Sequence, residues 1–333
     1  MNGRERVLAA IEGRERDHVP FWPFVMAFSA KYAGIPYSQF ATDYRKLGEA
    51  QIRTAEAFDL DVVTMDSDAY REASAFGAAL EYPEDDLPVL KQRAVVDKKS
   101  FSMKKPEITS SERLIDKIEG VRYLKERCGQ ERAVSGWIEA PFQSCGVLCQ
   151  MDTFLVDVLE EDAFVRELLE LVTEFEIEFA VEQARAGADI IGIGDAMASL
   201  VSAQVYGEQI YPWTKRVVEG IREKTSAKLK YHICGYSRHI LPYVEKLGVD
   251  VVNVDYKVDV EEAFALTGGK LAVKGNVDPV AVLKNGTEEE VRAAVREMAP
   301  FASRPYILSP GCEVPRDTPP ENLRAMSQEA KLF

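Results

Sequence analysis

The chain has 333 residues, 46% of them hydrophobic and 29% charged, and its 55 acidic residues outnumber its 41 lysines and arginines to give a formal charge of −14 at pH 7. This composition predicts a water-soluble globular protein with a sizeable core, and it argues against nucleic acid or an anionic membrane as the main partner. The charged N-terminal stretch lacks the apolar core of a signal peptide, no run approaches the ~18 apolar residues of a membrane span, and five scattered cysteines fit reduced thiols. We therefore expect a cytoplasmic protein.

Short runs rich in apolar and β-branched residues recur along the chain and predict eight strands. Helical spacing of apolar residues separates the later runs, and Ser202 and Thr287 are the expected N-caps of two of these helices. Glu290 lies three residues after Thr287 and completes a capping box. The predicted strands are 19–24, 61–65, 133–138, 189–194, 228–233, 250–254, 270–275 and 305–309, and the clearest predicted helices are 160–187, 202–224 and 287–299.

Strands that alternate with helices pair in parallel through right-handed crossovers. Eight such units favour an α/β fold of one domain over residues 1–333, a single (β/α)8 TIM barrel with an N-terminal helix. A doubly wound Rossmann sheet is the alternative, but no G-x-G-x-x-G follows the first predicted strand. Residues 66–130 are irregular for one βα unit, so we expect a long loop insertion after the second strand that lies over the barrel mouth, with a small second domain as the alternative.

Polar residues follow several of the predicted strands, at the end of the barrel where active sites are built. Glu139, Asp195 and Asp255 follow the third, fourth and sixth strands. We expect these three carboxylates to be catalytic, either by orienting a substrate and handling protons or by supporting a metal-bound histidine. Asn276 and Asp278 follow the seventh strand, where they also fit a simple turn before proline.

Three residues at two other strand ends predict a metal site. His232 and Cys234 are one residue apart at the end of the fifth strand, so both side chains can point to the same face, and Cys312 follows the eighth strand. Each residue alone fits a buried packing role, but all three map to one rim. One imidazole and two thiolates suit Zn²⁺, and three protein ligands leave the fourth position open, as in catalytic zinc sites.

Five stretches of the chain closely resemble the uroporphyrinogen decarboxylase superfamily of barrels. They are GWIEAPF (136–142), AGADIIGIGDAMASLVSAQVYGEQIYPW (186–213), YHICGYS (231–237), VKGNVDPVAVL (273–283) and ILSPGCEVPRDTPPENLRAM (307–326). The resemblance covers nearly the whole chain and is strongest from about residue 130 to residue 328. It implies the same barrel fold that the alternation of strands and helices predicts.

The segment after the first predicted strand separates two branches of this superfamily. Decarboxylases carry an arginine-rich signature there that binds the carboxylates of the porphyrinogen, whereas this chain reads PFWPFVMAFSAKYAG, without arginine. The other branch, the corrinoid-dependent methyltransferases of the methylcobamide:coenzyme M and O-demethylase type, has a zinc motif of His-x-Cys followed by a distant Cys in a Pro-Gly-Cys context. This motif falls on His232, Cys234 and Cys312.

The resemblance implies a zinc-dependent methyltransferase that moves a methyl group between a corrinoid (methylcobalamin), supplied by a corrinoid-binding partner protein, and a small substrate. The substrate is either a thiol acceptor or an O- or N-methyl donor, and the direction of transfer is left open. A tetrapyrrole decarboxylase and a catalytically silent corrinoid or tetrapyrrole binder are the alternatives. Four aromatic residues after the first strand either line a pocket for an aromatic methyl ether or belong to the core: Phe21, Trp22, Phe24 and Phe28.

Overall fold

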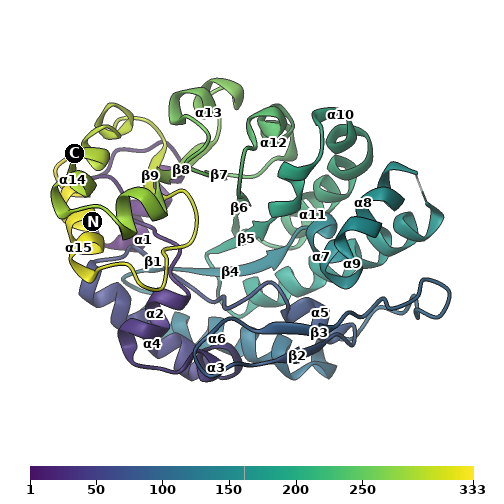
Figure 1. Ribbon diagram of the computed structural model, residues 1–333. Coiled ribbons are helices and arrows are strands. Elements are labelled where there is room, and N and C mark those ends of the chain that lie inside the picture. The colour runs from purple at the N-terminus through teal and green to yellow at the C-terminus, as the bar shows by residue number, and fades with distance from the viewer. Residues whose placement is uncertain (161) are drawn as a thin grey trace.

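A computed structural model describes residues 1–160 and 162–333, and within them seven parallel strands form one curved sheet ringed by helices (Figure 1). The strands follow the order β1-β4-β5-β6-β7-β8-β9. All seven are buried on both faces, except at Lys228, which explains why they read as continuous apolar runs. Their bounds are β1 Val62–Thr64, β4 Ala133–Glu139, β5 Ile190–Gly194, β6 Lys228–Ile233, β7 Val251–Val254, β8 Ala272–Val277 and β9 Tyr306–Pro310.

The segment predicted as the first strand closes the barrel without forming a regular strand. In residues 19–24, Phe21 forms an isolated parallel bridge with Leu308 of β9, and the Leu308 N–H donates to the Pro20 carbonyl at 2.9 Å. On the other side the Asp61 N–H donates to the Phe21 carbonyl at 3.0 Å, next to β1. Prolines in the segment lack the N–H groups that a ladder requires, so the pairing stays local. The TIM-barrel prediction is confirmed, with this segment as its eighth stave.

The helices cover the outside of the strands, and the expected caps are present. The Ser202 side chain accepts a hydrogen bond from the Val205 N–H, and Thr287 and Glu290 form the capping box. The helix expected at 160–187 is described from Ala163 onward, and residue 161 lies outside the described residues. The helix expected at 202–224 contains a π-helical turn at Tyr206–Ile210. The α-helices are α1 Gly3–Ile11, α2 Ala27–Ala33, α3 Tyr37–Thr42, α4 Tyr44–Phe58, α5 Arg71–Ala75, α6 Glu112–Cys128, α7 Pro141–Leu148, α8 Met151–Leu159, α9 Ala163–Arg185, α10 Ala203–Val205, α11 Tyr211–Lys224, α12 Leu241–Leu247, α13 Val260–Leu266, α14 Glu288–Arg296 and α15 Pro320–Ala330.

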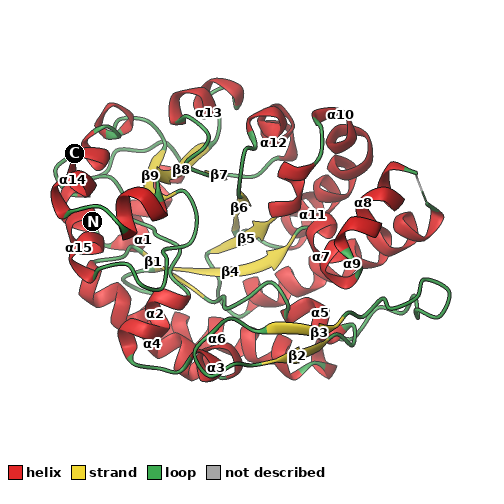
Figure 2. Cartoon of the chain, in the orientation of Figure 1, coloured by secondary structure: helices red, strands yellow, loops and turns green. Residues whose placement is uncertain are grey.

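The insertion expected at 66–130 is shorter and more regular than a loop. It begins with α5 and an antiparallel hairpin of β2 (Ala79–Glu81) and β3 (Val89–Gln92), which lies apart from the barrel strands (Figure 2). Its last part is α6, a barrel helix that packs against β4 and α4. The helical pattern of α6 was missed because a buried lysine, Lys117, interrupts its apolar row.

A small core cluster closes the N-terminal end of the barrel. Val7 and Ala10 of α1 pack there with Trp22 and with one residue from each of six strands: Val62, Ala133, Ile190, Val251, Ala272 and Ile307. The opposite, C-terminal end is therefore the end available for chemistry. Among the helices of the described residues, none has the length and apolar content needed to cross a membrane.

Asp61 joins α1 to the closing segment, and its removal tests how much that closure contributes. Its carboxylate pairs with Arg6 at 2.5 Å and accepts the Phe21 N–H at 2.7 Å, with both ionic side chains buried. Because the Arg6 charge would lose a buried partner, we expect Asp61→Ala to lower the free energy of unfolding by about 3–5 kcal/mol in denaturant titrations. The control is Asp317→Ala, which removes an exposed pair with Lys31 and should cost less than about 1 kcal/mol. Equal losses in the two variants would show that Asp61 is not a special tie.

Candidate functional site

The inward faces of three neighbouring strands meet at one level near the C-terminal end of the barrel. Glu139 of β4 pairs in register with Gly194 of β5, and Gly194 pairs with His232 of β6. Side chains alternate along a strand, so Trp137 shares the face of Glu139, and Cys234 continues the face of His232. Gly194 leaves a gap in this row, between a carboxylate and an imidazole.

His232, Cys234 and Cys312 form a compact cluster at this level. His232 Nε2 lies 3.0 Å from Cys234 Sγ, and the two Sγ atoms lie 3.1 Å apart. All three potential ligand atoms lie within 4.8 Å of one another. The sequence prediction that strands five and eight bring these residues to one rim therefore agrees with the coordinates.

The loop after β7 holds both cysteine-bearing loops in place. Asp255 accepts the Gly235 N–H at 2.9 Å, next to Cys234, and Gly235 has a φ of +82° that favours glycine. On the other side, a Cβ at position 311 would lie 2.3 Å from the Tyr256 backbone nitrogen, so only glycine fits beside Cys312. Asp255 thus supports the cluster through the backbone and makes no direct contact with a thiol.

Electrostatics favour one thiolate in the cysteine pair. A hydrogen bond from Cys234, helped by His232, lowers the pKa of Cys312 to about 4. The same hydrogen bond, together with burial, raises the pKa of Cys234 above its ordinary value. His232 is buried, and its Nδ1 atom has no hydrogen-bond partner among the described residues. A soft anion beside an unpaired imidazole suits a metal cation as the missing partner.

Aromatic rings form the wall beside this cluster. Phe24 stacks on Trp137 with ring centroids 5.0 Å apart, and the His232 ring lies 6.0 Å from Trp137. Of the four aromatic residues singled out in the sequence, only Phe24 belongs to this wall. Trp22 lies deeper, in the N-terminal core cluster, and Phe28 packs against a helix residue, Phe58. Those two side chains are core.

Of the other two predicted carboxylates, only Glu139 faces the cluster. Trp137 Nε1 donates to Glu139 Oε1 at 2.8 Å, and burial raises the pKa of Glu139 well above that of a free glutamate. Asp195 instead accepts a hydrogen bond from Tyr231 at 2.5 Å, and Tyr231 alternates with His232 and so lies on the opposite face of β6. Burial raises the pKa of Asp195 to about 7. Asp195 therefore belongs to the helix-facing layer behind the site.

The turn residues after β8 have structural partners. Asp278 caps a π-helical turn, Pro279–Lys284, by accepting the N–H groups of Val280 and Ala281 at 2.8 Å. Asn276 donates to the Asp255 carbonyl at 3.2 Å and so steadies the same supporting loop. The turn interpretation of these two residues agrees with these contacts.

Several polar residues around the site were missed in the sequence. They lie in helices or irregular segments, where a single charged residue in an apolar row carries no motif. The strongest available signal was the acidic pattern after β1, Met65-Asp66-Ser67-Asp68, which directly follows a buried strand. The missed residues near the site are Asp66, Glu72, Lys117, Glu176 and Lys230, all of them buried.

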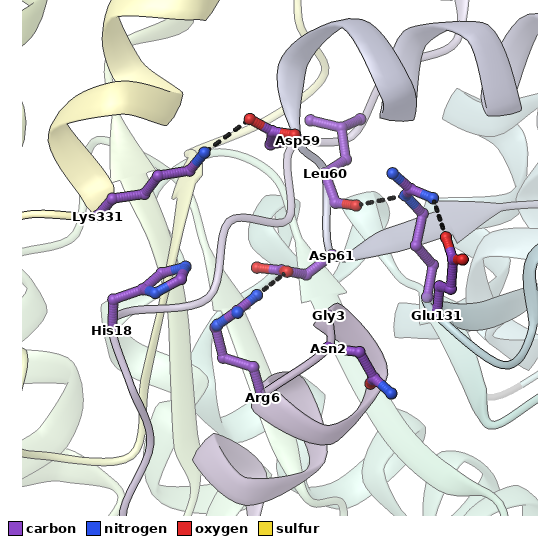
Figure 3. Close-up of a pocket in the computed structure, with 10 residues that line it drawn as sticks. Asn2, Gly3, Arg6, His18, Asp59, Leu60, Asp61, Glu131 and Lys331 are labelled. Atoms are coloured by element: carbon purple, nitrogen blue, oxygen red, sulfur yellow. Dashed lines mark hydrogen bonds and ion pairs between the residues drawn. The ribbon is translucent and has the colours of Figure 1, made fainter.

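A separate cavity of about 280 Å³ lies at the opposite, N-terminal end of the barrel (Figure 3). Its charged groups are largely paired with one another, since Arg6 contacts Asp61 and Lys331 contacts Asp59. In TIM barrels this face serves stability, while the chemistry lies at the other end. We therefore assign this cavity no part in catalysis.

Comparisons with known proteins agree over the whole chain. A family model described as uroporphyrinogen decarboxylase (URO-D) matches residues 2–333. The methylcobamide:CoM methyltransferase MtbA of Methanosarcina mazei is 27% identical, over 99% of this chain and 98% of the relative. A uroporphyrinogen decarboxylase of a Wolbachia species is 25% identical, over 86% of this chain and 83% of the relative. A solved structure of a methyltransferase from Methanosarcina mazei superposes with a TM-score of 0.91 at 20% identity, covering 100% of this chain and 99% of the other.

Thiol labelling tests the electrostatics of the cysteine pair. Because Cys312 is held as a thiolate, we expect iodoacetamide to label it in the metal-free protein already at about pH 6, with little change in rate up to about pH 8. An ordinary thiol gains about tenfold in rate per pH unit over this range. Cys234→Ala should restore that ordinary pH dependence to Cys312, while Cys128→Ala, a change on α6, should not. Mass spectrometry of the labelled peptides would reveal a tenfold rise per pH unit at Cys312 in the unchanged protein, an outcome incompatible with the paired thiolate.

Proposed function

The chain belongs to the uroporphyrinogen decarboxylase family, and from this premise we propose that it is a methyltransferase that moves a methyl group between a corrinoid and a small substrate. The corrinoid is supplied by a partner protein, and residues 1–333 act as one domain. The observation that carries the proposal is the convergence of His232, Cys234 and Cys312 at the C-terminal end of the barrel. The methyltransferase relative, matched over nearly its full length, supports the same reaction class.

The donor set fits zinc as the resident metal. One imidazole nitrogen and two cysteine sulfurs, all within 4.8 Å of one another, are the ligands that Zn²⁺ prefers, and they leave a fourth position for a substrate atom. When bound, zinc would act as a Lewis acid on the sulfur or oxygen of the substrate. Ligation through thiolates also requires reducing conditions, so we place the protein in the cytoplasm.

The surrounding residues position this set. Asp255 fixes the Gly235 turn beside Cys234, and Asp195 contacts β6 from behind, where its backbone N–H donates to the His232 carbonyl at 2.9 Å. Both carboxylates are therefore positioning residues. Phe24 and Trp137 exclude water from one side of the substrate space. Glu139 remains as the carboxyl group that faces this space directly.

Exposed apolar side chains border the opening of the site and suit a large partner. One follows each of four successive strands, β5 to β8, and more than two fifths of each is exposed: Leu200 at 59%, Tyr236 at 56%, Tyr256 at 42% and Val280 at 51%. Contiguous exposed apolar surface of this kind marks sites of protein association. A corrinoid-carrying protein that covers the mouth would bury all four and bring its cofactor over the cysteine pair.

A decarboxylase of a tetrapyrrole is the second candidate, favoured by the similarity to enzymes of that name. The α2 segment offers one cation, Lys31, and it pairs with Asp317 at 2.8 Å. A polycarboxylate substrate therefore lacks its arginine partners there. Turnover of uroporphyrinogen in the presence of a chelator would favour decarboxylation over methyl transfer.

Removal of a cysteine ligand tests the metal and the reaction together. We expect about one zinc per chain in the purified protein, and we expect Cys312→Ala to lose both the metal and methyl transfer from methylcobalamin to a thiol. Cys128→Ala is the matched control, because Cys128 is also a free cysteine but lies on α6. Metal analysis beside the transfer assay gives both readings, and full activity in Cys312→Ala would refute the proposal.

Substitution of the supporting carboxylate tests the role of the β7 loop. Asp255→Asn replaces one acceptor oxygen with a donor that faces backbone N–H groups, so the Gly235 turn should loosen. Supporting residues of this kind typically change metal affinity 10- to 100-fold, and we expect about tenfold weaker zinc binding in competition with a chelator. Asp259→Asn, which alters the cap of α13 in the same loop, should leave zinc affinity unchanged. Equal affinities in all three proteins would remove Asp255 from the site.

A further inference from the structure

Four buried carboxyl groups lie beside the candidate metal site with one lysine among them. Asp66, Glu72 and Glu176 are each no more than 3% exposed, and Glu139 is 5% exposed. Lys117 donates to Asp66 at 3.0 Å and to the Trp137 carbonyl at 3.2 Å, so its charge is committed. The remaining three carboxyls have no cationic partner among the described residues within ion-pair distance.

Burial decides the protonation of these three groups. Both oxygens of Glu72 and one oxygen of Glu176 accept no hydrogen bond from the described residues, and Ser144 supplies the other Glu176 oxygen at 2.6 Å. An ionised carboxylate without water or a counter-ion is too costly, so such groups stay protonated. The pKa values of Glu72, Glu139 and Glu176 are accordingly raised, first by burial and then by one another.

Glu139 brings one of these protonated groups to the substrate space. It occupies the same level as His232, with Gly194 between them, and strand spacing places their backbones about 10 Å apart. A Cβ at position 194 would lie 2.7 Å from Glu139 Oε2, so the carboxyl group lies over the glycine on the side of β6. The gap left by Gly194 is where a substrate held near His232 would meet an acid.

We propose that Glu139 is the acid that protonates the leaving oxygen of a methyl donor, and that the enzyme therefore removes methyl groups from methyl ethers or methanol. This inference rests on the proposed methyl transfer and assigns its direction. The O–CH₃ bond breaks, its electron pair stays on oxygen and takes the Glu139 proton, and the methyl group passes to the electron pair of a reduced corrinoid. Methylation of a thiol runs the other way and releases a proton, so it has no use for a protonated acid.

Glu72 and Glu176 form a proton reserve behind Glu139. After each turnover Glu139 is left as a buried carboxylate, and a partner protein over the mouth would block bulk water. The helices that carry the reserve pack together, since α5 contacts α7 and α7 contacts α9. A proton can therefore pass from Glu72 to Glu139 within the protein interior.

Rates in the two directions test the assignment. The probes are 2-methoxyphenol and methanol with cob(I)alamin for demethylation, and methylcobalamin with 2-mercaptoethanol for thiol methylation. Loss of a general acid costs about 10²–10⁴-fold, so we expect Glu139→Gln to lower the ratio of demethylation to thiol methylation by about 100-fold, with partial recovery in Glu139→Asp. The control is Glu131→Gln, an exposed change near the other end of β4. An equal loss in both directions would overturn the assignment.

The pH profile of demethylation gives a second reading. Glu139 faces Glu72, Asp66 and Lys117, and its Nε1 partner is Trp137, while Glu176 and Cys234 lie in the same electrostatic environment. Glu72 raises the pKa of Glu139. Glu72→Gln should therefore move the alkaline fall in demethylation rate to lower pH, because the acid is lost sooner. A merely structural role would lower the rate without moving the profile.

A third reading needs no metal and no turnover. The infrared absorption of a protonated carboxyl should be present in metal-free protein at about pH 7 and should weaken in Glu139→Gln but not in Glu131→Gln. Unchanged absorption would overturn the proposal. A protein that methylates thiols yet demethylates neither probe would overturn this inference alone, whereas a protein inactive in both directions would count against methyl transfer itself.

Discussion

The contact between Cys234 and Cys312 depends on closure of the barrel. These cysteines follow β6 and β9, which are three places apart in the sheet order, yet their sulfurs lie 3.1 Å apart. A flat sheet would hold the two loops well apart at spacings of about 4.8 Å per strand. Curvature brings them together, and the Pro20–Phe24 segment between β9 and β1 maintains that curvature. The chemistry of the site is thus a consequence of the fold's closure.

The barrel interior also carries more ionisable groups than a core normally accepts. Lys230 lies among the rings of Trp22, Phe24 and Trp137, and burial lowers its pKa to about 7. The buried carboxyls on the other side have raised pKa values. Groups held in their neutral forms in this way are typical of functional sites, because there a small change in surroundings moves a proton. The rigid, buried strands around them make such an arrangement tolerable.

Much of this molecule follows from its sequence. The apolar runs predicted seven strands to within three residues at each end, and spacing alone placed His232, Cys234 and Cys312 on one rim. The first strand was less regular than predicted, because prolines remove ladder donors, and α6 was hidden by Lys117. Asp195 was assigned to the mouth because it follows a strand, but strand alternation turns its carboxylate toward Tyr231. Glu72 and Glu176 could not be found, since their roles arise from packing between helices distant in sequence.

X-ray absorption at the zinc edge tests the central claim most directly. For the purified holoprotein the account predicts two sulfur ligands at about 2.3 Å, one imidazole nitrogen and one further light atom. Addition of a thiol substrate should bring a third sulfur into the first shell if the fourth position is open to substrate. A spectrum with only oxygen and nitrogen neighbours, or a fully active protein without zinc, would contradict the account.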